Sequence, residues 1–364
     1  MKFASQALCV AALSALSTGA SALTFNFTFL ASSTAQANQA FIDAGNRWSS
    51  LFSDNVTLNM TVGTASLGSG ILASTGSART TYSYSTFKTA LAADATSAND
   101  NTAVASLAAG SSFGMLINRT SDSPNGAGSA TPYVDNNGSA NNSTVRITNA
   151  NAKALGLAPT ATVVGNCAAA CDASITFGNA FTWDYNPTDG ITAGAYDFVG
   201  IATHELGHAL GFISGVDVLD TNSPNPSTPG PFSSDQFTYV SSLDLFRYSA
   251  QSFTSNVIDW TADARTKYFS INGGVTNTGG ATFATGTVFG DGRQASHWKD
   301  NLGVGIMDPT AAQGELLAIS ANDVTAFDVI GWNVATAVPE PTTWALFGLG
   351  LFGIALRRRG VRRA

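Results

Sequence analysis

The sequence predicts an α+β fold, because strand-like and helix-like segments are mixed along the chain. Apolar residues recur every three or four positions in some segments, as in helices, and every second position in others, as in strands. Residues 23–337 contain no repeat and no linker rich in proline or charge. We therefore expect this stretch to fold as one unit of the size of a catalytic domain.

The clearest elements lie in the first part of this unit. Residues 23–29 alternate as a strand does, residues 34–52 carry a helical apolar face, and residues 56–62 alternate again. Further elements are expected as helices near 85–93 and 101–108, strands at 143–148 and 174–177, and a surface loop rich in Asn, Gly and Ser at 121–143.

The composition restricts the classes of function. With 44% apolar and 11% charged residues, the chain is too apolar and too poor in charge to be disordered. Its net charge is -7, and several of its 17 basic residues are arginines at the extreme C-terminus. The rest of the chain is therefore more acidic still, which argues against nucleic acid as a partner.

The first 22 residues have the layout of a secretory signal peptide. Lys2 is followed by an apolar stretch at residues 7–16 and by small residues that end at Ala22. A buried first helix is the alternative. The strand-like alternation that begins directly after Ala22 favours cleavage at that point.

Residues 338–364 have the layout of a second targeting signal. An apolar run at 344–356 and a cluster of arginines follow the sequence Pro339-Glu340-Pro341. A helix of that run spans roughly 20 Å, less than the ~30 Å hydrocarbon core, so it is expected to be a short transmembrane segment at most. The order of these features resembles the PEP-CTERM sorting signal of Gram-negative bacteria.

That resemblance implies a protein that is secreted or held at the cell-envelope surface of a Gram-negative bacterium. It also implies that an exosortase-type membrane enzyme recognises the tail and cleaves it, so that membrane association through the tail is transient. A permanent C-terminal membrane helix is the alternative.

Cysteine use is consistent with export. Cys9 would leave with the signal peptide, so the mature chain keeps only Cys167 and Cys171. Two cysteines are too few for a structural zinc site. A local disulfide is therefore expected in an oxidising compartment.

Residues 203–212, with the sequence THELGHALGF, carry the candidate chemistry. His204 and His208 lie four residues apart on a predicted helix, so both imidazoles project from one side and can bind one Zn²⁺. Glu205 stands beside the first histidine, where it would act as a base on the attacking water. Gly211 is suited to end the helix. The alternative is a pair of structural histidines on a core helix.

A catalytic zinc needs a third protein ligand and a fourth position for water. A glutamate close downstream is excluded, because no Glu occurs between Glu205 and Glu315. The one remaining histidine of the chain, His297, is the first candidate. Asp217, just past the predicted helix, is the rival.

Three motifs together resemble those of the metzincin zinc peptidases. They are HELGHALGF, the sequence His-Trp-Lys that begins at His297 and the turn Met-Asp-Pro that begins at Met307. The long gap before the third histidine is similar to that of the leishmanolysin-like branch, and the tail to that of exported bacterial peptidases of the PEP-CTERM type. The resemblance implies that His204, His208 and His297 bind one catalytic zinc. It also implies that Glu205 is the general base and that Met307 packs beneath the metal.

The resemblance has consequences for the fold as well, although its motifs cover only residues 190–332. It implies a metzincin-like domain with an upper part of about 23–212 and a smaller lower part of about 213–337 that contains the methionine turn. The strand at 175–177 would then be an edge strand with which an extended substrate pairs.

Two features depart from the resembled family. Latency through a propeptide cysteine has no counterpart, because the two cysteines left after export are those assigned above to a disulfide. Several metzincins carry a tyrosine two residues after the turn methionine as an additional oxyanion donor, and here that position is Pro309.

Calcium is a weaker cofactor hypothesis. Asp184, Asp189 and Asp291 lie in predicted loops, but no loop matches a defined calcium-binding pattern.

The sequence therefore predicts a secreted zinc endopeptidase that acts on protein or peptide substrates. One alternative is a surface or matrix protein whose zinc module is structural or inactive, and another is an esterase or amidase that uses the same zinc chemistry. Glu205 favours an enzyme, because a structural site needs no base beside its ligands.

Overall fold

The computed structural model describes residues 23–223 and 232–335. The expected signal peptide at 1–22 and the tail at 338–364, with its apolar run, lie outside these residues. Helices and strands are mixed along the described chain, which is an α+β arrangement. None of the described helices is both long and apolar enough to span a bilayer.

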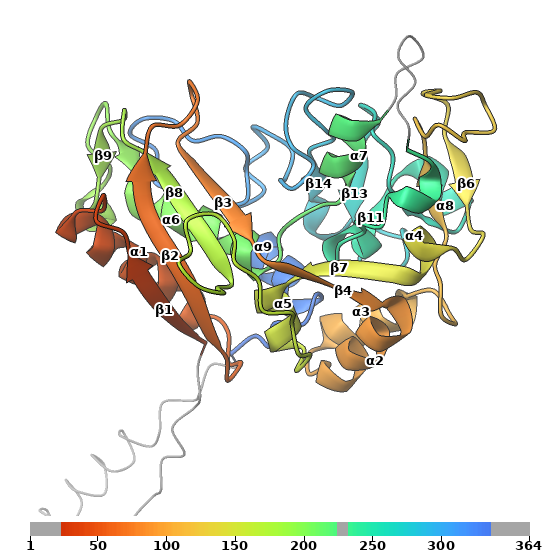
Figure 1. The fold of residues 1–364 in the computed structure, drawn as a ribbon, viewed down its shortest axis with the longest axis horizontal. Coiled ribbons are helices and arrows are strands. Elements are labelled where there is room, and N and C mark those ends of the chain that lie inside the picture. The colour runs from red at the N-terminus through yellow and green to blue at the C-terminus, as the bar shows by residue number, and fades with distance from the viewer. Residues whose placement is uncertain (1–22, 224–231, 336–364) are drawn as a thin grey trace, which may run out of the picture.

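Four strands form the largest sheet, on the left of Figure 1. The strands expected at 23–29, 56–62 and 174–177 all belong to it. The first three strands in the sheet order are parallel, and the fourth runs antiparallel to its neighbour. In that order they are β1 (Thr24–Phe29), β2 (Thr57–Ala65), β8 (Ala173–Gly178) and β3 (Ala73–Ser77).

The edge strand beside the site is β3, which corrects the expectation for residues 175–177. Those residues belong to β8, which pairs with β2 on one side and with β3 on the other. The sequence ASTGS of β3 contains a glycine and lacks apolar alternation, so it gives no strand signal. An edge strand tolerates such a sequence, because it is paired on one side only.

Two helices lie side by side against this sheet, α1 (Ala35–Ser49) and α6 (Phe198–Leu210). Phe41 of α1 packs edge-on against both Phe177 of β8 and Phe198 of α6, with ring centroids 5.2 and 5.3 Å apart. Phe177 and Phe198 stack at 4.1 Å. This buried aromatic cluster fixes α6 against the sheet.

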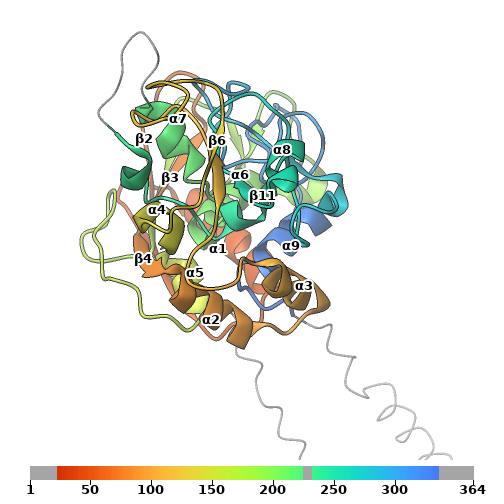
Figure 2. The ribbon, with the colours of Figure 1, turned by 90° about the vertical axis from the view of Figure 1, so that its right-hand side faces the viewer.

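Beyond β3 the chain forms a group of short elements around one antiparallel pair, β4 with β7. The helices expected near 85–93 and 101–108 form here as α2 and α3, at the bottom of the views in Figures 1 and 2. The members of the group are β4 (Arg79–Ser83), α2 (Tyr84–Asp94), α3 (Ala98–Ser106), β5 (Met115–Ile117), β6 (Tyr133–Asp135), α4 (Ala140–Ser143), β7 (Thr144–Thr148) and α5 (Asn149–Ala154).

The surface loop expected at 121–143 is not entirely irregular. It contains the short strand β6 and the helix α4. β6 forms because it pairs with β5, and local composition does not report such a contact.

After Gly211 the described chain is mostly irregular and its elements are short. They are α7 (Val216–Asn222), β11 (Arg247–Tyr248), α8 (Ala250–Thr254), β12 (Ile258–Asp259), β13 (Lys267–Phe269), β14 (Thr282–Phe283) and α9 (Ala321–Asp328). Two-residue strands and single 3₁₀ turns complete the description: β9 (Trp183–Asp184), β10 (Tyr196–Asp197), η1 (Pro187–Asp189), η2 (Ser234–Gln236), η3 (Leu243–Phe246) and η4 (Thr278–Gly280).

Each side of the boundary expected near residue 212 has a sheet of its own, β1-β2-β8-β3 before it and β11-β13-β14 after it, and a third sheet crosses the boundary. β12, after the boundary, pairs in parallel with β5, before it. The amide of Arg146 also donates to the carbonyl of Val240 at 2.8 Å. The two parts therefore share backbone pairing, and one cleft is lined by residues from both.

Candidate metal centre

Helix α6 carries the first two histidines and is held along its length. Asp197 caps its N-terminus by accepting a hydrogen bond from the amide of Gly200 at 2.8 Å. The indole of Trp48 on α1 donates to the carbonyl of Thr203 at 2.8 Å. Gly211 follows the last turn with a φ of 129°, which strains residues other than glycine, so the predicted end of the helix is confirmed.

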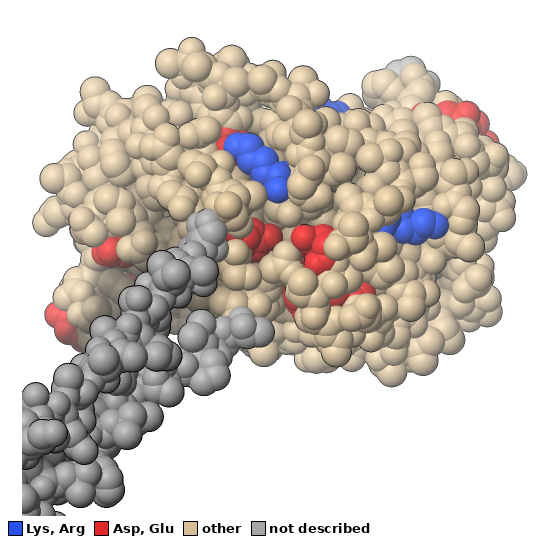
Figure 3. All heavy atoms as spheres, turned by 90° about the horizontal axis from the view of Figure 1, so that it is seen from below, with Lys and Arg blue, Asp and Glu red and all other residues tan. Residues whose placement is uncertain are grey.

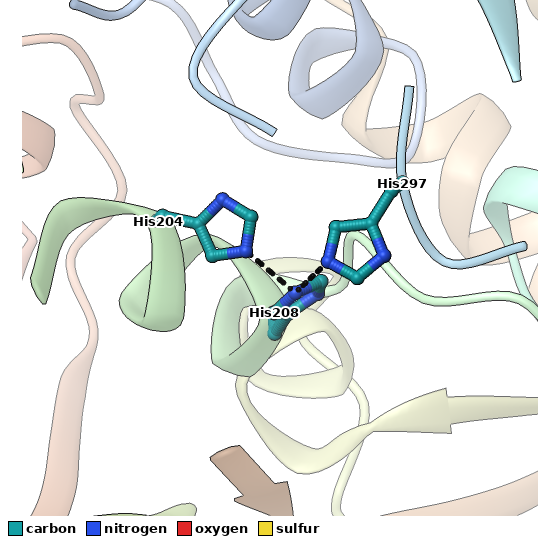
Figure 4. A group of neighbouring side chains, drawn as sticks. All are labelled: His204, His208 and His297. Atoms are coloured by element: carbon teal, nitrogen blue, oxygen red, sulfur yellow. Dashed lines mark hydrogen bonds between the residues drawn. The ribbon is translucent and has the colours of Figure 1, made fainter. Parts of the chain in front are cut away.

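The three histidines of the chain converge, as Figure 4 shows. The Nε2 atom of His208 lies 3.1 Å from Nε2 of His204 and 3.1 Å from Nε2 of His297. His297 comes from irregular chain 89 residues after His208. In the described parts of the chain, no other group of three His, Cys, Asp or Glu side chains is close enough to share an ion.

The second nitrogen of each ring faces a backbone carbonyl. Nδ1 of His204 lies 2.7 Å from the oxygen of Ile306, and Nδ1 of His208 lies 2.7 Å from the oxygen of Phe212. Nδ1 of His297 lies 3.3 Å from the oxygen of Gln294. A carbonyl oxygen only accepts, so each Nδ1 carries the proton and each Nε2 presents a lone pair.

Burial keeps two of these rings neutral. It lowers the pKa of His208 to about 3, and a positive charge on His204 would lower that pKa further. Burial also lowers the pKa of His297 well below its ordinary value, with further lowering by His208 and His204. Neutral imidazole is the form that binds a metal ion.

The donor set fits a zinc ion. The lone pair on Nε2 of His208 lies 3.1 Å from Nε2 of each of the other two histidines, and lone pairs at this distance repel unless a cation lies between them. Ligands at 2.0–2.1 Å from a tetrahedral zinc lie about 3.3 Å apart, close to the separations observed. Backbone carbonyls on the opposite ring nitrogens are the usual orienting partners of zinc-binding histidines.

Glu205 is buried beside this cluster, with 6% of its surface exposed. The hydroxyl of Thr75, on the edge strand β3, donates to Oε2 of Glu205 at 2.5 Å. Burial raises the pKa of Glu205, while the charge of His204 and the hydrogen bond from Thr75 lower it. Sequence reasoning missed Thr75, because β3 carries no pattern that places it near the helix.

Met307 packs against the histidine helix at Gly207. It is fully buried. A Cβ atom added at Gly207 would lie 2.5 Å from the Met307 sulfur, so the helix needs a glycine at this point of contact. The glycine inside the HELGH motif is therefore explained by a side chain 100 positions later in the chain.

Asp323, at the start of α9, organises the methionine turn, and sequence reasoning missed it. Its buried carboxylate accepts hydrogen bonds from the amide of Ile306 at 2.8 Å and from the indole of Trp298 at 2.8 Å. It also accepts from the amide of Ser320 at 2.7 Å. One carboxylate thus holds the residue that follows His297 and the turn that faces His204.

Asp217, the rival third ligand, has a different role. Its carboxylate accepts hydrogen bonds from the amide of Ala295 at 2.6 Å and from the amide and hydroxyl of Ser296. It is not part of the cluster of converging donors. Burial raises its pKa to about 6 against the effect of these hydrogen bonds. Asp217 therefore positions the segment that presents His297.

A cleft of about 760 Å³ opens over the three histidines. The edge strand β3 forms one wall and helix α6 its floor. The other walls come from chain after Gly211, including Pro309 of the methionine turn. The cleft therefore brings the histidines, Glu205 and a free sheet edge to one surface.

The other candidate residues are also placed. Cys167 and Cys171 form the expected disulfide, with Cα atoms 6.4 Å apart. The aspartates considered for calcium do not gather. Asp184 accepts from Thr192 and Asn186, Asp189 accepts from Asn186, and Asp291 pairs with Lys299 at 2.6 Å.

The face seen in Figure 3 carries only scattered charged side chains.

Comparison with known proteins identifies one feature of the chain. The model of the PEP-CTERM protein-sorting motif matches residues 337–359. This motif is recognised by exosortase and marks proteins exported to the cell envelope of Gram-negative bacteria, so the protein is exported there. Neither a curated protein nor a solved structure matches the chain.

Proposed function

We propose that the protein is a zinc-dependent endopeptidase that acts outside the cytoplasm. The observation that carries this proposal is the convergence of three Nε2 lone pairs, each oriented by a carbonyl on Nδ1, beside a buried carboxylate in an open cleft. A purely structural zinc site would be closed by a fourth protein ligand. Here the described donors provide three and leave a side open to the cleft.

His204, His208 and His297 would hold the ion. Bound there, zinc supplies a Lewis acid that lowers the pKa of water and polarises a carbonyl. Glu205 would take the proton of the attacking water on its carboxylate and return it to the leaving amine. Thr75, hydrogen-bonded to Oε2 of Glu205 at 2.5 Å, orients that carboxylate.

The edge strand β3 supports an extended peptide as the substrate. In the described chain β3 pairs with β8 only, so its outer side has free amide and carbonyl groups. Ala73 and Ser74 of this strand line the cleft. An extended peptide can add to such an edge through main-chain hydrogen bonds, which tolerate many sequences.

The test compares Glu205→Gln with the unaltered chain, using casein cleavage and bound zinc as the two measurements. We expect kcat/KM to fall by about 10²–10⁴, with zinc content unchanged, because Glu205 is not a ligand. Glu315→Gln is the matched control, since Glu315 is exposed and lies outside the cleft.

Two outcomes would contradict the proposal. Zinc bound at one equivalent without cleavage of any protein substrate would indicate a structural site. Hydrolysis of esters or small amides without cleavage of peptides would indicate the same chemistry on a different substrate class.

A further inference from the structure

Arg79 stands at one end of the cleft, at the start of β4 and two residues after β3. Thr75, Ser77 and Arg79 alternate along the chain, and all three line the cleft. Thr75 contacts Glu205, and the Ser77 hydroxyl lies 3.5 Å from the carbonyl oxygen of His208. Thr75, Ser77 and Arg79 therefore follow α6 toward its C-terminal end, and Arg79 comes after the residue that lies beside His208.

The side chain of Arg79 makes no hydrogen bond and no ion pair within the described chain, although it is partly buried. A guanidinium offers five donors, and buried cations are ordinarily paired. The other arginine of the cleft, Arg293, is paired with Asp300 at 2.9 Å. Arg79 is thus a positively charged side chain in the cleft whose guanidinium N–H groups have no acceptor within the described chain.

The acidic groups that influence Arg79 are occupied elsewhere. Asp217 holds the segment before His297, as described above. Asp244 accepts from the amide of Gly215 at 2.8 Å and from the indole of Trp260 at 3.1 Å. Burial and the charge of Arg146 lower the pKa of Arg79, and the two aspartates raise it. An arginine remains charged under these conditions.

We propose that Arg79 binds a carboxylate of the substrate, so that the protein prefers peptides with Asp or Glu close to the bond it cleaves. The proposal rests on the peptidase function proposed above. Arg79 lies four positions after Thr75, the residue that contacts the base, and four steps of extended chain span ~13 Å. The acidic residue is therefore expected within four positions of the scissile bond.

A structural role is the competing explanation. A cation at the C-terminal end of α6 also opposes the negative end of the helix dipole. In that case the charge of the substrate would not matter.

The experiment uses the full chain loaded with zinc and pairs of peptides. The two peptides of a pair differ only in having Glu or Gln at one position. Separate pairs place this residue at each of the four positions on either side of the scissile bond. We expect kcat/KM to be about tenfold higher for Glu at one position, as for a hydrogen-bonded ion pair. Arg79→Gln should bring this ratio close to one, and Arg79→Glu should favour Lys there. Arg293→Gln is the matched control and should leave the ratio unchanged.

The outcomes are separable. Cleavage with no preference for Glu at any position, or a preference that survives in Arg79→Gln, overturns the role of Arg79 and leaves the peptidase function standing. Absence of cleavage of every peptide by the zinc-loaded chain overturns both proposals. If Arg79→Gln does not fold, Arg79→Lys provides the test. It keeps the charge and is expected to retain part of the preference, and full loss of the preference in a folded Arg79→Lys would contradict a charge-based role.

Discussion

The two sides of the cleft differ in how their backbone groups are hydrogen-bonded. The sheet side consists of β1, β2, β8 and β3 with helices α1 and α6, and most of its backbone groups pair within those elements, apart from the free outer side of β3. The loop side consists of the chain after Gly211, which has few regular elements. On the loop side, buried carboxylates take the place of sheet and helix hydrogen bonds.

Three aspartates show this replacement on the loop side. Asp220 accepts from the amides of Val288 and Phe289 at 2.8 and 2.9 Å. Asp217 and Asp323 hold the segments on either side of His297. The comparison teaches that two of the histidines are positioned by a helix on a packed sheet, whereas the third depends on a few carboxylates.

The largest effect is expected for Asp323→Ala, which would break the loop side. The change leaves buried donors of Trp298, Ile306 and Ser320 without an acceptor, and each such loss costs about 1–3 kcal/mol. We expect the free energy of unfolding to fall by about 3–9 kcal/mol, the sum over the three donors, and zinc to be lost from molecules that remain folded. Urea unfolding and metal content would measure the two effects.

Phe41→Ala is the matching change on the sheet side. Removing a fully buried ring should cost about 3–5 kcal/mol. Because Phe41 packs behind α6, zinc content per folded molecule should stay at the value of the unaltered chain. Equal loss of zinc in both variants would remove the distinction between the two sides.

Gly207→Ala tests the point at which the two sides touch. The added methyl group meets the Met307 sulfur, and overpacking of this kind costs 1–3 kcal/mol, partly offset by the better helix propensity of alanine. We expect a net loss of about 1 kcal/mol. Combining it with Met307→Val should recover part of that loss, and simple additivity in this double-mutant cycle would contradict direct contact.

The smallest effect concerns Asp54, far from the cleft on the sheet side. Burial raises its pKa to about 6, against a hydrogen bond from the amide of Asn333. Because the folded pKa is raised, the folded state binds this proton more tightly, so the contribution of Asp54 to stability is greatest below about pH 4 and declines as the pH rises to about 6.

Asp54→Asn should therefore reduce the decline of stability with pH. We expect it to raise the free energy of unfolding at pH 7 by about 1 kcal/mol, a value that allows for solvent screening. Unfolding free energies at pH 4, 5, 6 and 7 would measure this. An unchanged slope in the variant would assign the decline to other carboxyl groups, such as Asp328, whose pKa burial also raises to about 6.

The features that could be predicted from the sequence are local ones. His204, His208 and Glu205 are recognisable because a helix fixes which side chains share a face. Gly211 is recognisable because a helix end needs a residue that tolerates positive φ. The strands β1, β2 and β8 follow from alternation of apolar residues.

The features that could not be predicted depend on contacts between distant segments. The strand β3 is short and polar and forms through pairing with β8. The role of Asp323 depends on donors 17 and 25 positions away, and Thr75 meets Glu205 across 130 positions. Asp217 appeared as a rival ligand because its residue type is compatible with zinc, whereas its hydrogen bonds decide its role.

The most direct test of the account is the zinc content and X-ray absorption spectrum of the purified protein, compared with those of His297→Ala. We predict one zinc ion per chain with three imidazole ligands, and in the variant a loss of zinc or a site with two imidazoles. A protein that binds no zinc, or a spectrum that does not change when His297 is removed, would contradict the shared site.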